Sequence, residues 1–201
     1  MKTTILTIAT VCSLVLGTVN STKANDKDTN ATVLADVRNI NKIEVRGNVE
    51  LFVSDGTEDQ VKVYNRYYAE NALVQNSKGV LRITSYTKEK LVVWVKASDL
   101  RAISAYDNAS VKSFGKLSAI ALDVDLHNTA SASLAINTIS ANVTVADKAK
   151  ADLSGNVNEY ALNYGHATSV NYAKLVAASP AKIQKSNSPV TKVITNELAA
   201  L

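Results

Sequence analysis

Three polar side chains at alternate positions are the residues of this chain best placed to do chemistry together. Asp123, Asp125 and His127 are separated by Val124 and Leu126, so in a strand all three point to one face, with neighbours roughly 6–7 Å apart. Such a set could bind a metal ion or supply the acid pair of a glycosidase. The solvated face of a half-buried strand gives the same pattern, and we favour that interpretation. Asp123, Asp125 and His127 are retained as candidate ligand-binding residues.

Other catalytic arrangements find little support. His127 and His166 are the only histidines, and each stands beside an expected turn. The chain has no Gly-x-Ser-x-Gly elbow, phosphate-binding loop or His-Glu-x-x-His motif. The only cysteine is Cys12. We therefore predict a protein that is not an enzyme and that has no catalytic residue, no metal and no cofactor.

Aromatic residues are the better candidates for a ligand contact. An exposed tyrosine or tryptophan offers a sugar ring or a partner protein an apolar face with a polar tip. Trp94 lies between Val93 and Val95, and we expect it to fill the core. We expect exposure, and hence ligand binding, at three tyrosines of the first half: Tyr64, Tyr67 and Tyr68. The predicted partner is a glycan or a surface protein.

The first 24 residues have the layout of an export signal. A positive Met1-Lys2 end precedes an apolar stretch from Ile5 to Gly17, and Thr22 and Ala24 fit a small-x-small cleavage site. The stretch is shorter than the roughly 20 residues that span a bilayer, and no later segment approaches that length. Because Cys12 leaves with the signal, the mature chain has no thiol, which suits an oxidising compartment. We predict export to the periplasm, the cell surface or the exterior.

Composition and charge exclude several classes. The chain has 201 residues, 46% hydrophobic and 20% charged, with 7 Gly and 2 Pro, so collagen-like and low-complexity classes are excluded. A polar segment at 25–35 reads as a flexible arm, and 36–201 as one domain. Loss of Lys2 and Lys23 with the signal lowers the formal net charge from +4 to +2. We therefore expect no nucleic-acid partner.

The first half of the domain shows the period-two alternation of strands. The predicted strands are 43–46, 49–53, 61–64, 80–83 and 91–95. Gly47-Asn48 predicts a hairpin or a bulge. Residues 65–76 have apolar positions near helical spacing and predict one short helical piece.

The second half repeats a small, small-or-polar, aliphatic triplet. The triplets end at residues 111, 134, 153, 170 and 190, spaced 23, 19, 17 and 20 residues apart. Each follows residues that tolerate a left-handed turn, such as Asp107-Asn108 and Asp147-Lys148. Alternating strands at 121–126, 139–145, 160–164 and 175–177 lie between triplets. A unit of about 20 residues has the size of one solenoid coil, and the 19 Asn suit hydrogen-bonded ladders along such a stack. A meander or a sandwich with coincidental spacing is the alternative.

The segment Ile43-Glu-Val-Arg-Gly-Asn-Val-Glu-Leu-Phe-Val53, the segment Asp99-Leu-Arg-Ala-Ile-Ser104 and the repeated triplets carry a resemblance to a known family. Together they resemble the bacterial secreted proteins called putative auto-transporter adhesin, head GIN domain. The resemblance implies a β-solenoid-like fold, export and a suggested role in adhesion, and it brings no catalytic set. Asn108, Thr129, Lys148 and His166 stand where the family pattern favours glycine or another residue at positive φ.

We thus predict an exported all-β protein. Its fold is expected to be a right-handed parallel β-helix-like solenoid with an N-terminal hairpin-rich capping section. Its expected function is a non-enzymatic adhesion or ligand-binding surface of the cell envelope or the exterior. The alternatives are a polysaccharide-acting β-helix enzyme and a periplasmic structural or assembly module.

Overall fold

The computed structural model describes residues 31–34, 37–64 and 72–186, which form strands and no helix. The predicted signal at 1–24 and residues 25–30 lie outside the described residues, whereas 31–34, within the predicted arm, form strand β1. The strands are β1 (Ala31–Leu34), β2 (Lys42–Arg46), β3 (Val49–Asp55), β4 (Gln60–Tyr64), β5 (Ala72–Ser77), β6 (Val80–Ser85), β7 (Leu91–Ala97), β8 (Ala102–Ala105), β9 (Ser110–Leu126), β10 (Ser131–Val145), β11 (Lys150–Gly165), β12 (Ser169–Ala177) and β13 (Lys182–Ser186).

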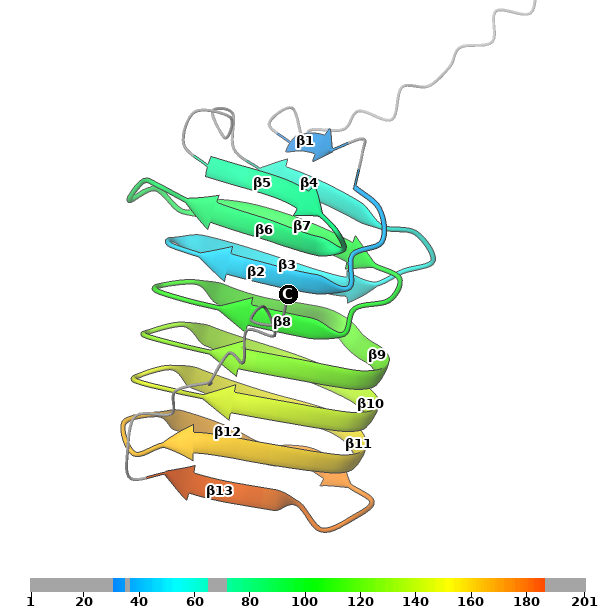
Figure 1. Ribbon diagram of the computed structural model, residues 1–201, viewed down its shortest axis with the longest axis vertical. Helices are drawn as coiled ribbons and strands as arrows, with labels where there is room; N and C mark the ends of the chain where they lie inside the picture. Colours follow the sequence, from blue (N-terminus) through cyan, green and yellow to red (C-terminus); the bar gives the residue numbers. More distant parts are fainter. Residues whose placement is uncertain (1–30, 35–36, 65–71, 187–201) are drawn as a thin grey trace, which may run out of the picture.

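These strands form one curled, mixed sheet whose two sides face each other across the core (Figure 1). The β3 wall contains β1, β4, β7, β3, the first halves of β9, β10 and β11, and β12. The β2 wall contains β5, β6, β2, β8, the second halves of β9, β10 and β11, and β13. The predicted all-β class is confirmed, while the right-handed parallel β-helix-like solenoid stays a prediction.

Strands β9, β10 and β11 each run along the β3 wall, bend, and continue along the β2 wall. They pair in parallel, with Ser110 opposite Ser131 and Ser131 opposite Lys150. The same register brings Asp123 opposite Asn142. Each strand with its corner therefore forms one layer of the second half.

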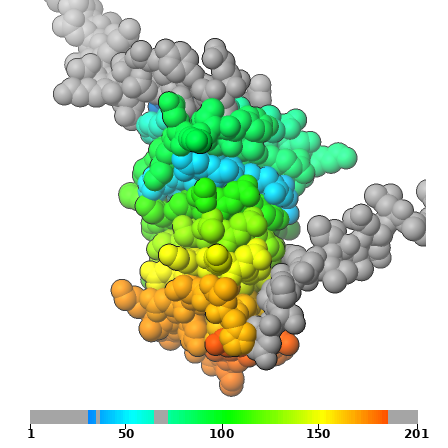
Figure 2. All heavy atoms as spheres, turned by 90° about the vertical axis from the view of Figure 1, so that its left-hand side faces the viewer, coloured from blue at the N-terminus to red at the C-terminus, as the bar shows by residue number. Residues whose placement is uncertain are grey.

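The first half does not stack in sequence order. Strands β2 and β3 flank Gly47 but do not pair: β2 pairs with β6 and β8, and β3 with β7 and β9. In Figure 2 the blue band of β2 and β3 accordingly lies between green bands from later in the chain. The hairpin predicted at Gly47-Asn48 is wrong, because Gly47, at φ +80°, turns the chain from one wall to the other.

The far end of the first half is antiparallel. Strand β1 pairs with β4, β4 with β7, and β5 with β6. The helical piece predicted at 65–76 is wrong over 72–76, which belong to β5, and 65–71 lie outside the described residues. Leu73 pairs with Thr84 and Val74 with Ile83, so pairing with β6 overrides the weak helical spacing.

Short corners join the layers, and their backbone conformation explains the polar residues there. Asp107, Asn128 and Asp147 have φ of 59°, 58° and 55°, a region that asparagine and aspartate enter more readily than most residues. Positive φ thus falls one position before Asn108, Thr129 and Lys148, where the family pattern placed it. His166 is not among the positive-φ residues.

The corner side chains also form a ladder along the stack. The Gly47 N–H donates to Asp107 Oδ2 (3.2 Å), the Asp107 N–H to Asn128 Oδ1 (3.1 Å) and the Asn128 N–H to Asp147 Oδ2 (2.8 Å). Each corner therefore supplies the acceptor for the backbone of the corner before it. This confirms the expectation that polar corner residues bond along the stack.

The true repeat differs from the triplet spacing. Val111 pairs with Ala132, Ala132 with Ala151, and Ala151 with Val170, at intervals of 21, 19 and 19 residues. The triplet ending at Leu134 is therefore out of register with the one ending at Val111. The triplet at 188–190 lies outside the described residues.

Candidate functional site

The two Phe and the one Trp of this chain meet at a single place on the surface. Phe52 and Trp94 are stacked, with ring centroids 4.7 Å apart, and Phe114 tilts onto Trp94 at 5.4 Å. The buried core is aliphatic, and Tyr160 is the only aromatic among its described members. Large apolar rings left outside an available core mark a candidate contact surface.

Strand alternation places two of the rings outward. In β3, Leu51 and Val53 are buried and Phe52 between them faces out; in β7, Val93 and Val95 are buried and Trp94 faces out. Parallel pairing then sets Phe52 directly opposite Trp94. The expectation that Trp94 fills the core is wrong, because Trp94 belongs to the alternate side chains of β7 that face away from the core.

Phe114 reaches the site through a bulge in β9. Lys112 pairs with Ser133 and Lys116 with Ala135, so residues 113–115 stand opposite Leu134 alone. These two extra residues account for the 21-residue interval of this layer against 19 in the next. Gly115 has φ +82° and nothing close to the position of a Cβ, and the Ser113 hydroxyl accepts the Ala135 N–H at 2.8 Å. The bulge leaves Phe114 66% exposed, and bulges commonly re-aim side chains in this way.

A groove lies beside the rings, on the outer face of the β3 wall. It has a volume of about 350 Å³. Its lining combines three aromatic rings with hydrogen-bonding and cationic side chains: Ser54, Gln60, Lys62, Tyr64, Trp94, Val95, Lys96 and Phe114. We call this the aromatic groove. Flat rings beside a few polar groups can hold a ligand by stacking and by hydrogen bonds.

Next to the groove, Glu50 forms ion pairs with two lysines. Its carboxylate lies 2.7 Å from Lys112 Nζ and 3.7 Å from Lys90 Nζ. The hydrogen bond from Lys112 lowers the pKa of Glu50 below its ordinary value, with a smaller contribution from the charge of Lys90. The same Lys112 Nζ lies 5.6 Å from the centre of the Phe52 ring, so the Glu50–Lys112 ion pair lies at the Phe52 end of the ring cluster.

The predicted ligand-binding residues lie in different places. Tyr64 lines the aromatic groove but is half-buried and not exposed as expected, whereas Tyr67 and Tyr68 lie outside the described residues. Asp123 and Asp125 lie at the end of β9 in the β2 wall, where β9 pairs with β8, and His127 directly follows the strand. The structure therefore does not bring Tyr64 together with the Asp-Asp-His set.

Within that set the three side chains have different surroundings. Asp123 is exposed, while Asp125 is only 8% exposed, between buried Ser104 and Thr144. The His127 ring stacks on Tyr106 at 5.0 Å, and the Arg46 guanidinium lies 3.8 Å over the other ring of the pair, Tyr106. Over 31–34, 37–64 and 72–186, no cluster of His, Cys, Asp and Glu suited to a metal ion is found.

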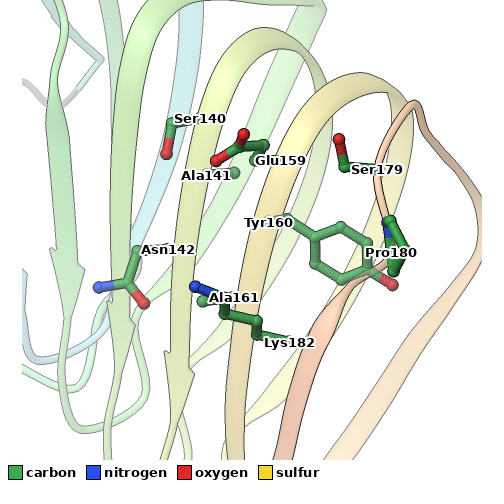
Figure 3. Close-up of a pocket in the computed structure, with 9 residues that line it drawn as sticks. All are labelled: Ser140, Ala141, Asn142, Glu159, Tyr160, Ala161, Ser179, Pro180 and Lys182. Atoms are coloured by element: carbon green, nitrogen blue, oxygen red, sulfur yellow. The ribbon is translucent and has the colours of Figure 1, made fainter.

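A second hollow lies in the last layers (Figure 3). Its volume is about 330 Å³, and its lining comes from β10, β11, the link to β13 and the first residue of β13. Ser140 stands opposite Glu159, and Lys182 supplies a cation. Tyr160 lies at its floor, 7% exposed, and burial, followed by the neighbouring Tyr172, raises the pKa of its phenol. No exposed ring comparable to Phe114 lines this hollow.

Sequence reasoning missed Phe52, Trp94 and Phe114 as a set. The alternation of side chains around Trp94 is clear in the sequence, but it does not tell which of the two alternating sets faces the core. Phe114 was hidden because two extra residues in one repeat look like irregular spacing. The signal that could have found the site is the 21-residue interval between the corners Asp107 and Asn128, against 19 between Asn128 and Asp147.

Comparisons with known proteins agree with this fold. The model of the family described as putative auto-transporter adhesin, head GIN domain, matches residues 39–199. No curated protein shows significant similarity to the chain.

Solved structures provide fold neighbours at low identity. A crystal structure of a putative adhesin from Bacteroides fragilis has a TM-score of 0.68 at 15% identity and covers 78% of each chain. A putative adhesin from Parabacteroides distasonis has a TM-score of 0.59 at 13% identity, covering 77% of this chain and 78% of that one. A putative lipid binding protein from the same species has a TM-score of 0.59 at 9% identity, with coverage of 78% and 79%. At these identities the neighbours show a shared fold.

In the described part of the chain, no helix has both the length and the apolar character needed to cross a bilayer.

Proposed function

This chain belongs to the family described as putative auto-transporter adhesin, head GIN domain, and we propose that it is an exported, non-enzymatic protein that binds a ligand through the aromatic groove. The observation that carries the proposal is that every Phe and Trp of the chain lies in one cluster on the surface. A protein that needed these rings for stability alone would gain more by burying them.

The bulge supports a binding role. Strand β10, in the next layer, follows the same path without residues that correspond to 114 and 115. The two extra residues leave Phe114 largely in water, where it contacts Trp94. An insertion that exposes an aromatic ring is costly unless a ligand covers the ring.

In this proposal the stacked layers are the scaffold that presents the groove. Parallel pairing of β9, β10 and β11, interrupted by the bulge in β9, supports a right-handed β-solenoid for the second half. The apolar stretch from Ile5 to Gly17 and the Thr22–Ala24 site support export to the envelope or the exterior. The adhesin description of the family and of two fold neighbours favours a binding protein over an enzyme.

The test is a binding screen of the purified protein against immobilised glycans and extracellular-matrix proteins. Wild type should bind at least one ligand, and Phe114→Ala should bind it at least about tenfold more weakly. The matched control is Ile120→Ala, which removes another exposed apolar side chain from β9 (79% exposed). Equal binding by wild type and Phe114→Ala to every ligand found would contradict the proposal. Export is tested separately, by whether residues 1–24 carry a reporter out of the cytoplasm.

A further inference from the structure

We infer that the aromatic groove binds an acidic polysaccharide, whose sugar rings stack on Trp94 and Phe114 and whose anionic groups contact Lys62 and Lys96. The inference rests on the proposed function, since it names the ligand class of the same groove. Its evidence is the order of the side chains across the strands and the charge of the groove.

Two groove side chains, Lys62 and Trp94, stand in register with their neighbours across four strands. Lys62 pairs with Trp94, Trp94 with Phe52, and Phe52 with Lys112. Neighbouring strands are about 4.8 Å apart, so the row runs across the strands for roughly 14 Å with a lysine at each end. At the groove end of this row Lys62 stands beside Trp94, whereas Lys112 at the other end is matched by Glu50.

A second row adds a cation and two hydrogen-bonding groups. Gln60 pairs with Lys96, and Lys96 with Ser54. These three side chains line the groove beside the rings. Aromatic rings that pack against the C–H face of a sugar, with amide and hydroxyl groups at the edge, fit the mixed apolar and polar surface of a carbohydrate.

The charge of the groove is positive. Its lining contains Lys62 and Lys96 and no acidic side chain. The ion pairs found over 31–34, 37–64 and 72–186 leave both lysines out, whereas Lys112 is matched by Glu50. The nearby Asp55 carboxylate accepts the Ser118 N–H at 2.6 Å. Two lysines outside these ion pairs, beside the exposed Phe114 ring, favour an anionic ligand over a neutral one.

Glycine at position 56 helps to place one of these cations. A Cβ on Gly56 would lie 2.1 Å from Lys96 Cδ and 2.2 Å from Lys96 Cγ. The absence of a side chain at this turn therefore lets the Lys96 stem lie over it. Gly56→Ala should displace the lysine without touching the rings.

Trp94 is the only tryptophan of the chain, so the fluorescence of the unmodified protein reports on the groove. The probes are polygalacturonate for carboxylates, dextran sulfate for sulfates, and neutral dextran. We expect Trp94 emission to change with one or both anionic polymers but not with dextran, and the affinity to fall as salt is raised. A response to one anionic polymer alone identifies which group the lysines recognise.

Charge variants test the residues. The double variant Lys62→Gln, Lys96→Gln should weaken binding by at least about tenfold, and Gly56→Ala should weaken it in the same direction. Lys148→Gln, at an exposed corner, is the matched control and should bind as wild type does. Urea unfolding of each variant establishes that the fold is intact.

Three results would overturn the inference. Neutral dextran could bind as tightly as the anionic polymers, the double variant could bind them as wild type does, or Trp94 could respond only to vesicles of anionic phospholipid. If a neutral or protein ligand binds and Phe114→Ala abolishes its binding, the proposed function stands and only the acidic-polysaccharide inference fails. If no ligand depends on the groove, both fail.

Discussion

The Phe114 ring lies 5.4 Å from the Trp94 ring, although the two residues belong to strands that do not pair with each other. Strand β3 separates them, and only the bulge at residues 113–115 allows the Phe114 side chain to reach across. The contact joins the irregular first half of the molecule to the regular second half. The groove therefore lies at the junction between these two parts of the sheet.

Removing the bulge should remove binding without unfolding the protein. The layers below place Leu134 and Leu153 where this layer has three residues. Replacing residues 113–115 by one leucine should keep the all-β circular dichroism spectrum and the stability to urea, since the new side chain fills a core position. Ligand binding should fall at least about tenfold because Phe114 is lost. Unchanged ligand affinity in a folded variant would contradict the role of the bulge.

The corner ladder should contribute measurably to stability. Asn128→Ala loses a side-chain acceptor and places alanine at φ 58°, and we expect a loss of about 2 kcal/mol in the free energy of unfolding. Asn128→Gly loses only the acceptor and should cost about 1 kcal/mol. Urea denaturation checks both values. Lys148→Ala, at an exposed corner position, is the control, and a cost as large as that of Asn128→Ala would refute this account of the ladder.

Alanine substitutions at two glycines distinguish the cost of backbone strain from the cost of a steric clash. Gly115 has φ +82° with open space around it, whereas at Gly155, φ +105°, a Cβ would lie 2.1 Å from the Ile136 carbonyl oxygen. Gly115→Ala should cost about 1 kcal/mol, and Gly155→Ala at least about 3 kcal/mol, because backbone of the paired strand must move. Thermal unfolding of the two variants measures the difference. Equal costs would show that the close approach at Gly155 is not rigid.

Lowering the pH should weaken the ion pairs that Glu50 forms with Lys90 and Lys112. Because the hydrogen bond from Lys112 lowers the pKa of Glu50 below its ordinary 4.5, the stabilisation is present above that value. It is lost as pH falls through the lowered pKa. The lysines are about half exposed, so we expect Glu50→Gln to cost under about 1 kcal/mol at neutral pH and nothing once Glu50 is protonated. Urea unfolding of both proteins over a pH series checks this, and a cost that persists in acid would point to packing instead of charge.

Much of the fold could be predicted from local patterns in the sequence. Period-two alternation located the strands at 43–46, 49–53, 80–83 and 91–95, because one buried face is enough to impose it. The polar corners were also predictable, since Asp107, Asn128 and Asp147 are residue types that enter positive φ. The resemblance to the GIN domain family is confirmed over residues 39–199.

The pairing of distant strands could not be predicted in the same way. Whether Gly47 begins a hairpin or a change of wall depends on β6, β7, β8 and β9, which lie far along the chain. The candidate site could not be predicted for the same reason. Phe52, Trp94 and Phe114 are distant in sequence, and only the register of three strands and a bulge brings them together.

The most direct test of the account is a titration of wild type and Phe114→Ala with the anionic polysaccharides while Trp94 emission is recorded. The account predicts a saturable change in the wild-type emission. It also predicts at least about tenfold weaker binding by the variant, with Ile120→Ala indistinguishable from wild type. The account would be contradicted by binding that leaves Trp94 emission unchanged and is equally tight in all three proteins, since the ligand would then lie elsewhere on the surface.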